Sequence, residues 1–223
     1  MKKKVATTLI LVILLLAVSL PIAEASEKNI VIRIKSKIHP KYIIAELKSK
    51  LYLLYFNIGK YYFKAGKINM SIRMFIKTTK VNPKFAPAYH NLGVAYYKKG
   101  EIKKAINEFK KSIEVDQRYV KGHYSLGILY FQLGNFTEAI KSLSKVVELE
   151  PENPNVNFDL GQSYVARFRK NEEKGNPNFK DLEMGLKYLK KTEEIKPGFP
   201  HALNNIKIIE SILKARKELT SSK

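Results

Sequence analysis

The stretch "NLGVAYYKKGEIKKAINEF", residues 91–109, carries small and aromatic residues at spacings that recur along the chain. Its marker residues are Gly93, Tyr96, Gly100, Ala105 and Phe109. When this stretch is moved along the sequence by the same number of residues toward either end, similar residues align with its marker residues. They are Gly127, Tyr130, Gly134, Ala139 and Leu143 after the stretch, and Gly59, Tyr62, Gly66, Ser71 and Phe75 before it. A fixed period of this kind indicates a repeat architecture.

A fourth copy, at 159–197, is longer than the others. The separation of its two small residues, Gly161 and Gly185, is twice that of the matching pair in the second copy, Gly93 and Ala105. The added residues lie within 167–183 and include the turn signal Gly-Asn-Pro-Asn at 175–178. We expect both helices of this unit to gain about six residues, which would extend the pair by roughly 9 Å. We favour the interpretation that this is a tolerated insertion at a loop tip over the alternative that it is a protruding docking element specific to this unit.

These residues resemble the tetratricopeptide repeat (TPR) family, whose unit is a pair of antiparallel helices about 34 residues long. The resemblance includes an early aromatic residue and a Leu/Ile-Gly pair in the first helix, a glycine at the turn, and a small residue in the second helix. A proline closes three units, at Pro83, Pro151 and Pro197, whereas the second unit has Gln117 there. The resemblance implies an all-α, right-handed superhelical solenoid of about four antiparallel helix pairs with a C-terminal capping helix.

The small residues have a physical reason in such an arrangement. Gly93 of the first helix would meet Ala105 of the second, where small residues let two backbones approach closely. Gly100 follows the last helical turn, where a left-handed cap favours glycine. One helical pair cannot bury its apolar face, so the units must stack. The array is expected at 52–199, with repeats at 52–85, 86–119, 120–153 and 154–199, and a capping helix with a frayed tail at 200–223.

Residues 1–25 have the three parts of a secretory signal peptide. Three lysines precede the mostly apolar run 5–20, and small residues stand at Ala23 and Ala25. We expect cleavage after Ala25 and export to the periplasm or cell envelope of a bacterium. A retained N-terminal membrane anchor is the alternative, although the run reaches a proline before the roughly 20 apolar residues that a span needs.

Residues 26–51 are expected to form an extended segment and a lead-in helix. The stretch "NIVIRIKSKI" at 29–38 alternates apolar and basic residues, which is a weak strand signal. Residues 39–56 have helical periodicity, and the sequence leaves open whether they form one helix or two.

The chain is strongly basic, with 41 Lys and Arg against 20 Asp and Glu and a net charge of +21. Loss of residues 1–25 removes three Lys and one Glu, which leaves 38 basic and 19 acidic residues and a net charge of +19. Such a charge favours anionic partners such as lipid headgroups, acidic envelope polymers or acidic proteins. The positive charge is explained equally well if the host's proteins are generally rich in lysine and these lysines only solvate the helix surfaces. Nucleic acid is disfavoured for a chain expected to be exported, and no RNA- or DNA-binding motif is present.

The sequence offers no pattern typical of an enzyme, and we expect no catalytic site, metal or cofactor. The histidines, at positions 39, 90, 123 and 201, never form a helical i, i+4 metal pair. His123 takes the place of the early aromatic residue of its repeat, which favours a packing role. A Ser/His/Asp triad cannot be judged from chain order, but nothing in the sequence indicates one.

The TPR resemblance implies a scaffold that binds peptides on a concave face formed by the first helix of each pair. The glycine register assigns this groove to Phe56, Asn57, Lys60 and Phe63 in the first unit, His90, Asn91, Val94, Tyr97 and Lys98 in the second, Tyr124, Ser125, Ile128 and Phe131 in the third, and Phe158, Asp159 and Gln162 in the fourth. Asn57 and Asn91 stand where family members often bond the ligand backbone, whereas Ser125 and Asp159 interrupt that series. Phe56 and Lys60 replace the Lys and Asn of the family's carboxylate clamp, which makes the clamp's ligand doubtful here.

Two functions remain open at this level. The first is a scaffold of the cell envelope that grips an extended segment of another protein, with Phe56, Tyr97, Tyr124 and Phe131 as anchors. Lys60 and Lys98 would then favour an acidic segment. The second is a basic peripheral module held to an anionic membrane or envelope polymer by charge.

Overall fold

The computed structural model describes the backbone of residues 40–221 and the side chains from Lys50 to Ser221. The expected signal peptide at 1–25 and the alternating segment at 29–38 lie outside the described residues. The chain divides into two units, Met1–Ser49 and Lys50–Lys223. The repeats lie in the second unit, and it is described by itself below.

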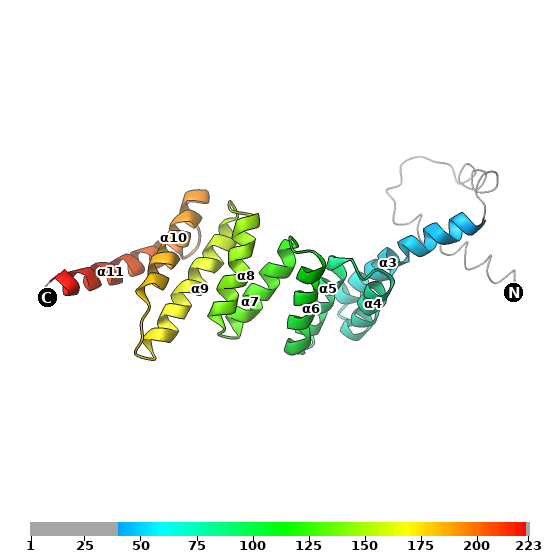
Figure 1. The fold of residues 1–223 in the computed structure, drawn as a ribbon, viewed down its shortest axis with the longest axis horizontal. Helices are drawn as coiled ribbons and strands as arrows, with labels where there is room; N and C mark the ends of the chain where they lie inside the picture. Colours follow the sequence, from blue (N-terminus) through cyan, green and yellow to red (C-terminus); the bar gives the residue numbers. More distant parts are fainter. Residues whose placement is uncertain (1–39, 222–223) are drawn as a thin grey trace. The chain divides into compact units, whose positions relative to one another are not determined.

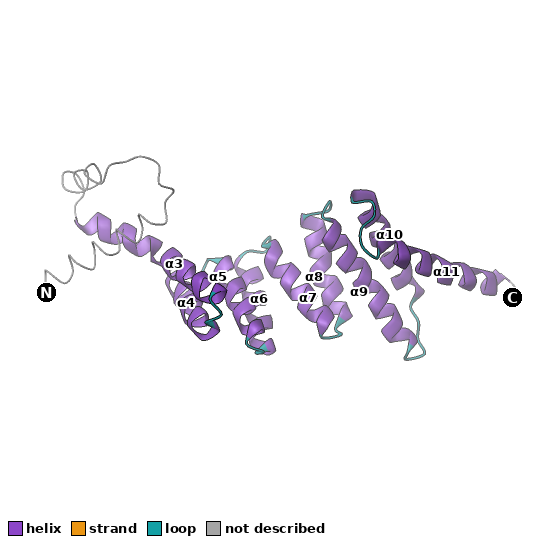
Figure 2. Ribbon diagram, turned by 180° about the vertical axis from the view of Figure 1, so that it is seen from behind, coloured by secondary structure: helices purple, strands orange, loops and turns teal. Residues whose placement is uncertain are grey.

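Within residues 40–221 the chain is helical, without strands (Figure 2). A single helix covers residues 40–56, where the sequence did not decide between one helix and two. The helices are α3 (Pro40–Lys64), α4 (Ile68–Val81), α5 (Ala86–Lys98), α6 (Ile102–Val115), α7 (Val120–Gln132), α8 (Phe136–Leu149), α9 (Pro154–Glu172), α10 (Phe179–Ile195) and α11 (Ala202–Ser221).

The helices form pairs joined by short turns: α3 with α4, α5 with α6, α7 with α8, and α9 with α10. Figure 1 shows the pairs following one another in chain order, with α11 after the last pair. The predicted all-α solenoid of helix pairs is therefore confirmed.

The close crossing within each pair depends on its glycine. A Cβ atom added at Gly93 would lie 2.7 Å from the Phe109 ring and 3.2 Å from the carbonyl oxygen of Ala105. Both distances are shorter than ordinary van der Waals contact, so the crossing of α5 and α6 requires a residue without a side chain. At the turn, Gly100 has φ +82, a left-handed conformation that favours glycine. The sequence-based roles of both glycines are confirmed.

The core is continuous from one pair to the next. One buried cluster joins the second and third pairs through Phe109 of α6, Leu126 and Tyr130 of α7, and Ala139 of α8. Another joins α8 to α9 through Leu143 and Leu160, among others. Each pair therefore buries its apolar surface against its neighbours, as expected for a repeat array.

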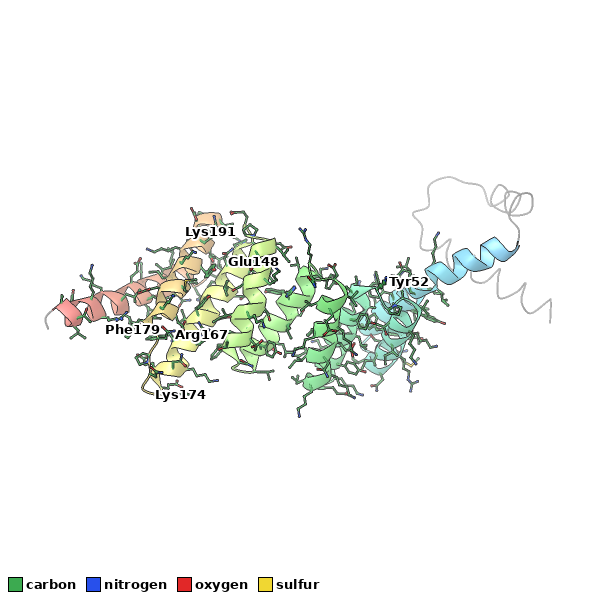
Figure 3. All side chains as sticks on the ribbon, viewed as in Figure 1. Tyr52, Glu148, Arg167, Lys174, Phe179 and Lys191 are labelled. Atoms are coloured by element: carbon green, nitrogen blue, oxygen red, sulfur yellow. The ribbon has the colours of Figure 1, made fainter. Side chains whose placement is uncertain are left out.

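The insertion lengthens both helices of the fourth pair. Helix α9 has 19 residues, whereas α5 and α7 have 13 each. Helix α10 has 17 residues, whereas α6 and α8 have 14 each. The gain is thus larger in α9 than in α10, and the rest of the insertion forms the turn that contains Lys174 (Figure 3). The sequence had predicted an equal gain in the two helices.

Helix α11 covers the end of the array. Ile206 and Ile209 are buried in a cluster with Val165, Phe168 and Leu182 of the fourth pair. Leu203, on another face of α11, is 52% exposed. None of the helices in the described part of the chain is long and apolar enough to cross a membrane.

Candidate functional site

The first helices of the second and third pairs border a hollow of about 180 Å³. Its walls come from α5 and α7, and the ring of Phe109 from α6 also lines it. The lining residues are Val94, Tyr97, Phe109, Tyr124, Ser125, Ile128, Leu129 and Gln132. Five of these eight, namely Val94, Tyr97, Tyr124, Ser125 and Ile128, belong to the predicted groove. The structure therefore brings the central part of that residue set together.

A histidine bridges the second and third repeats beside this hollow. A hydrogen bond of 3.0 Å joins Nε2 of His90 on α5 and the hydroxyl oxygen of Ser125 on α7. The imidazole lies near the rings of Phe109 and Tyr119, with centroid distances of 5.6 and 5.7 Å. Burial, reinforced by the nearby charge of Lys121, lowers the pKa of His90 to about 4. His90 is therefore neutral at pH 7, and its buried Nδ1 has no hydrogen-bond partner.

An equivalent bridge joins the third and fourth repeats. The Tyr124 hydroxyl on α7 donates a hydrogen bond of 2.8 Å to Oδ2 of Asp159 on α9. In both bridges the two bonded residues are equally far apart in the sequence. The first residue stands three positions before the helix-crossing glycine of its repeat. The second stands two positions before the matching glycine of the next repeat. Burial raises the pKa of the Asp159 carboxyl, against the opposing effect of the Tyr124 hydrogen bond. Burial and the same hydrogen bond raise the pKa of Tyr124.

Tyr97 is the most accessible of the four aromatic residues expected to anchor a ligand. It is 38% exposed, whereas Phe56, Tyr124 and Phe131 are half-buried. Its hydroxyl donates to Oε1 of Gln132 at 3.0 Å, which fixes the ring at the junction of α5 and α7. The ring therefore borders the hollow and remains partly exposed.

The remaining aromatic groove residues pack against neighbouring rings of the same chain. Phe56 contacts Phe85 with a centroid distance of 5.1 Å, and the Lys60 ammonium lies 5.0 Å from the Phe56 centroid. Two further ring pairs are Phe131 with Phe136 at 5.5 Å and Phe158 with Phe199 at 5.0 Å. Phe63 likewise packs against the core of the first pair. These rings contribute to the packing of the face more than to its free surface.

The polar groove residues differ in how much of their bonding capacity is used. Asn57, Lys60 and Lys98 are exposed. Asn91 donates its Nδ2 to the carbonyl oxygen of Pro87 at 2.8 Å, which leaves its amide oxygen as an acceptor. Gln162 is half-buried on α9.

Sequence reasoning missed Gln132 and a second, larger hollow. Gln132 has the same register position in the third repeat as Lys98 in the second, so the register applied evenly to every unit would have included it. The larger hollow has a volume of about 610 Å³ and lies among α6, α7 and α8. Lysines and glutamates are mixed on its walls, including Lys110, Glu114 and Lys141. No repeated signal in the sequence singles out this mixture.

Across the described part of the chain, no group of three His, Asp or Glu residues could hold a metal ion.

Comparisons with known proteins agree on the fold. The family model described as TPR repeat matches residues 59–100, 95–134 and 129–166. No curated protein matches the chain in sequence.

Among solved structures, the MamA protein is similar with a TM-score of 0.63 and 23% identity, over 77% of this chain and 87% of MamA. YrrB, described as a TPR protein with an unusual peptide-binding site, has a TM-score of 0.62 and 20% identity, over 79% of this chain and 84% of YrrB. The first TPR domain of Spaghetti (RPAP3), bound to the HSP90 peptide SRMEEVD, has a TM-score of 0.50 and 26% identity. That match covers 53% of this chain and 94% of the domain. Residues 59–166 therefore match the TPR repeat model, and the described helices form a TPR-like solenoid.

Proposed function

We propose that this protein is a non-catalytic scaffold that binds an extended segment of another protein along the first helices of its repeats. The observation that carries the proposal is the hollow of about 180 Å³ between α5 and α7, lined by five residues of the predicted groove. Peptide binding by the RPAP3 domain, and the peptide site reported for YrrB, support the same use of the fold.

The chemistry of the hollow suits a side chain from such a segment. Val94, Ile128 and Leu129 supply an apolar lining, while Tyr97 and Gln132 add polar groups. Ligand sites commonly combine an apolar lining with a few placed polar groups. The exposed Lys60 and Lys98 favour acidic residues in the part of the segment that lies beside the first two repeats.

We also propose that the scaffold works in the cell envelope after export. The support is the basic, apolar and small-residue order of residues 1–25, which is typical of a signal peptide.

The groove proposal is tested with a displayed library of random dodecapeptides selected against the protein. An enriched peptide should lose about five- to thirty-fold in affinity on Tyr97→Ala, as expected for loss of an aromatic anchor. Tyr61→Ala is the matched control, because Tyr61 is 69% exposed on α3 and outside the groove register. Equal affinity for both variants would show that the hollow is not the site.

A second candidate function is electrostatic binding to an anionic membrane or polymer. Its support is a lysine that occupies the same register position in the second helix of each pair. These residues are Lys77, Lys111, Lys145 and Lys191. Three of the four are paired with glutamates, for example Lys111 with Glu108 at 2.7 Å, which weakens the attraction that this series offers. Vesicles that contain anionic lipid distinguish the two functions, since binding by charge should collapse between about 0.05 and about 0.5 M salt.

A further inference from the structure

We propose that Asp159 gives the groove a cation-binding position, so that the bound segment carries a lysine or arginine beside the third and fourth repeats. This inference rests on the proposed peptide-binding function. The inference specifies the charge of the bound segment at the point where the segment crosses from α7 to α9.

Asp159 is placed beside the hollow by the residue it bonds. Tyr124 lines the hollow and donates its hydroxyl to Oδ2 of Asp159 at 2.8 Å. Asp159 is half-buried on α9, so its carboxyl group has lost part of its hydration without leaving the surface. Burial is also the main influence on its pKa, which is raised.

The carboxylate has unused bonding capacity. A carboxylate can accept about four hydrogen bonds, and Tyr124 supplies one. Among residues 50–221, no lysine or arginine forms an ion pair with Asp159, although the whole chain has twice as many basic as acidic residues. A partly dehydrated carboxylate without a cation is stabilised by an incoming ammonium or guanidinium group.

The same face has the opposite charge on its earlier repeats. Lys60 and Lys98 are exposed on α3 and α5, whereas Asp159 is on α9. A segment that satisfies both parts has acidic residues beside the first two repeats and a basic residue beside the fourth. The order of charges along the segment then sets its direction in the groove, because the reversed orientation would bring like charges together.

The test compares peptide libraries selected against the wild-type protein, Asp159→Asn and Asp159→Lys. Asn keeps an oxygen that can accept from Tyr124 and removes the charge, so the fold is maintained. Glu183→Gln is the matched control, because Glu183 is an exposed carboxylate on α10 of the same repeat. Melting temperatures of all variants verify folding before selection.

The expected result is enrichment of lysine or arginine at one position with the wild type and with Glu183→Gln. This enrichment should disappear with Asp159→Asn and change to Asp or Glu with Asp159→Lys. A peptide enriched on the wild type should bind Asp159→Asn about tenfold more weakly. Enrichment without a basic position, or a basic position that Asp159→Asn retains, overturns this inference and leaves the groove proposal standing. Failure to enrich any peptide, or enrichment that Tyr97→Ala does not affect, overturns the proposed function itself.

Discussion

Arg167 and Asp181 form a two-point ion pair across the lengthened fourth repeat. Nε of Arg167 on α9 donates to Oδ2 of Asp181 at 2.9 Å, and its Nη2 donates to Oδ1 at 2.6 Å. The Asp181 side chain is only 3% exposed, and the Arg167 guanidinium also lies 5.3 Å from the Tyr164 ring centroid. Arg167 and Phe179, labelled in Figure 3, lie on the two helices of this pair. The ion pair joins the later part of α9 to the start of α10.

Removing Arg167 should destabilise the protein because it leaves a buried carboxylate without its partner. We expect Arg167→Met to lower the free energy of unfolding by about 3 kcal/mol, the low end for broken buried pairs. Urea unfolding measures this loss. The double variant Arg167→Met, Asp181→Leu should lose less than the single variant, because it removes the buried charge as well. A single variant as stable as the wild type would contradict the structural role of the pair.

Acidification should weaken the junction between the second and third repeats. The pKa of His90 falls from 6.5 to about 4 in the folded protein, so the unfolded chain binds the proton more readily. His90 therefore contributes stability above pH 6.5 that is lost as the pH falls from 6.5 to about 4. The full loss is about 3 kcal/mol. Protonation would bury a charge near Phe109 and Tyr119 and beside Lys121.

Unfolding measured from neutral pH down to about pH 4 checks this dependence against two variants. His90→Gln cannot titrate and should show a shallower pH dependence than the wild type. Asp159→Asn should lose more stability on acidification than the wild type. Asp159 acts in the opposite direction, because its raised pKa favours the folded state at low pH. Identical slopes for the wild type and His90→Gln would rule out the role of His90.

Filling the helix crossing of the third repeat should disrupt the stacking. A Cβ added at Gly127 would lie 2.7 Å from Cγ of Leu143, and Leu143 is fully buried. Gly127→Leu should therefore cost at least about 3 kcal/mol, at the upper end for overpacking. Gly134→Ala serves as a control, because that site has no atom within 4 Å and the cost is only the left-handed φ of +67. This control should lose about 1–2 kcal/mol. An unchanged melting temperature for Gly127→Leu would refute the helix register.

Processing of the chain is tested by intact-mass measurement on the protein from its native host. The prediction is a mature N-terminus at Ser26 and recovery with soluble exported material. A mass that includes residues 1–25 would favour the retained membrane anchor instead.

The sequence by itself predicted the helix pairs, and which residues lie on the face formed by the first helices followed from the glycine register. Gly93 and Ala105 are close in the sequence and meet inside one pair, so the information for their contact is local and recurs in each unit. The added length of the fourth pair could also be predicted, because it is a difference in spacing. Repetition makes such local signals readable without an alignment.

Only the tertiary structure decided which groove side chains remain available to a ligand. The register placed Tyr124 and Asp159 on the same face, yet their hydrogen bond depends on how far and at what angle the third pair stacks on the fourth. The stacking of the second pair on the third likewise brings His90 within hydrogen-bonding distance of Ser125. Arg167 and Asp181 likewise meet only because α9 and α10 have a particular rotation about their axes. Such contacts between side chains leave no periodic pattern in the sequence, since a change in crossing angle can move a side-chain tip far enough to make or break a hydrogen bond.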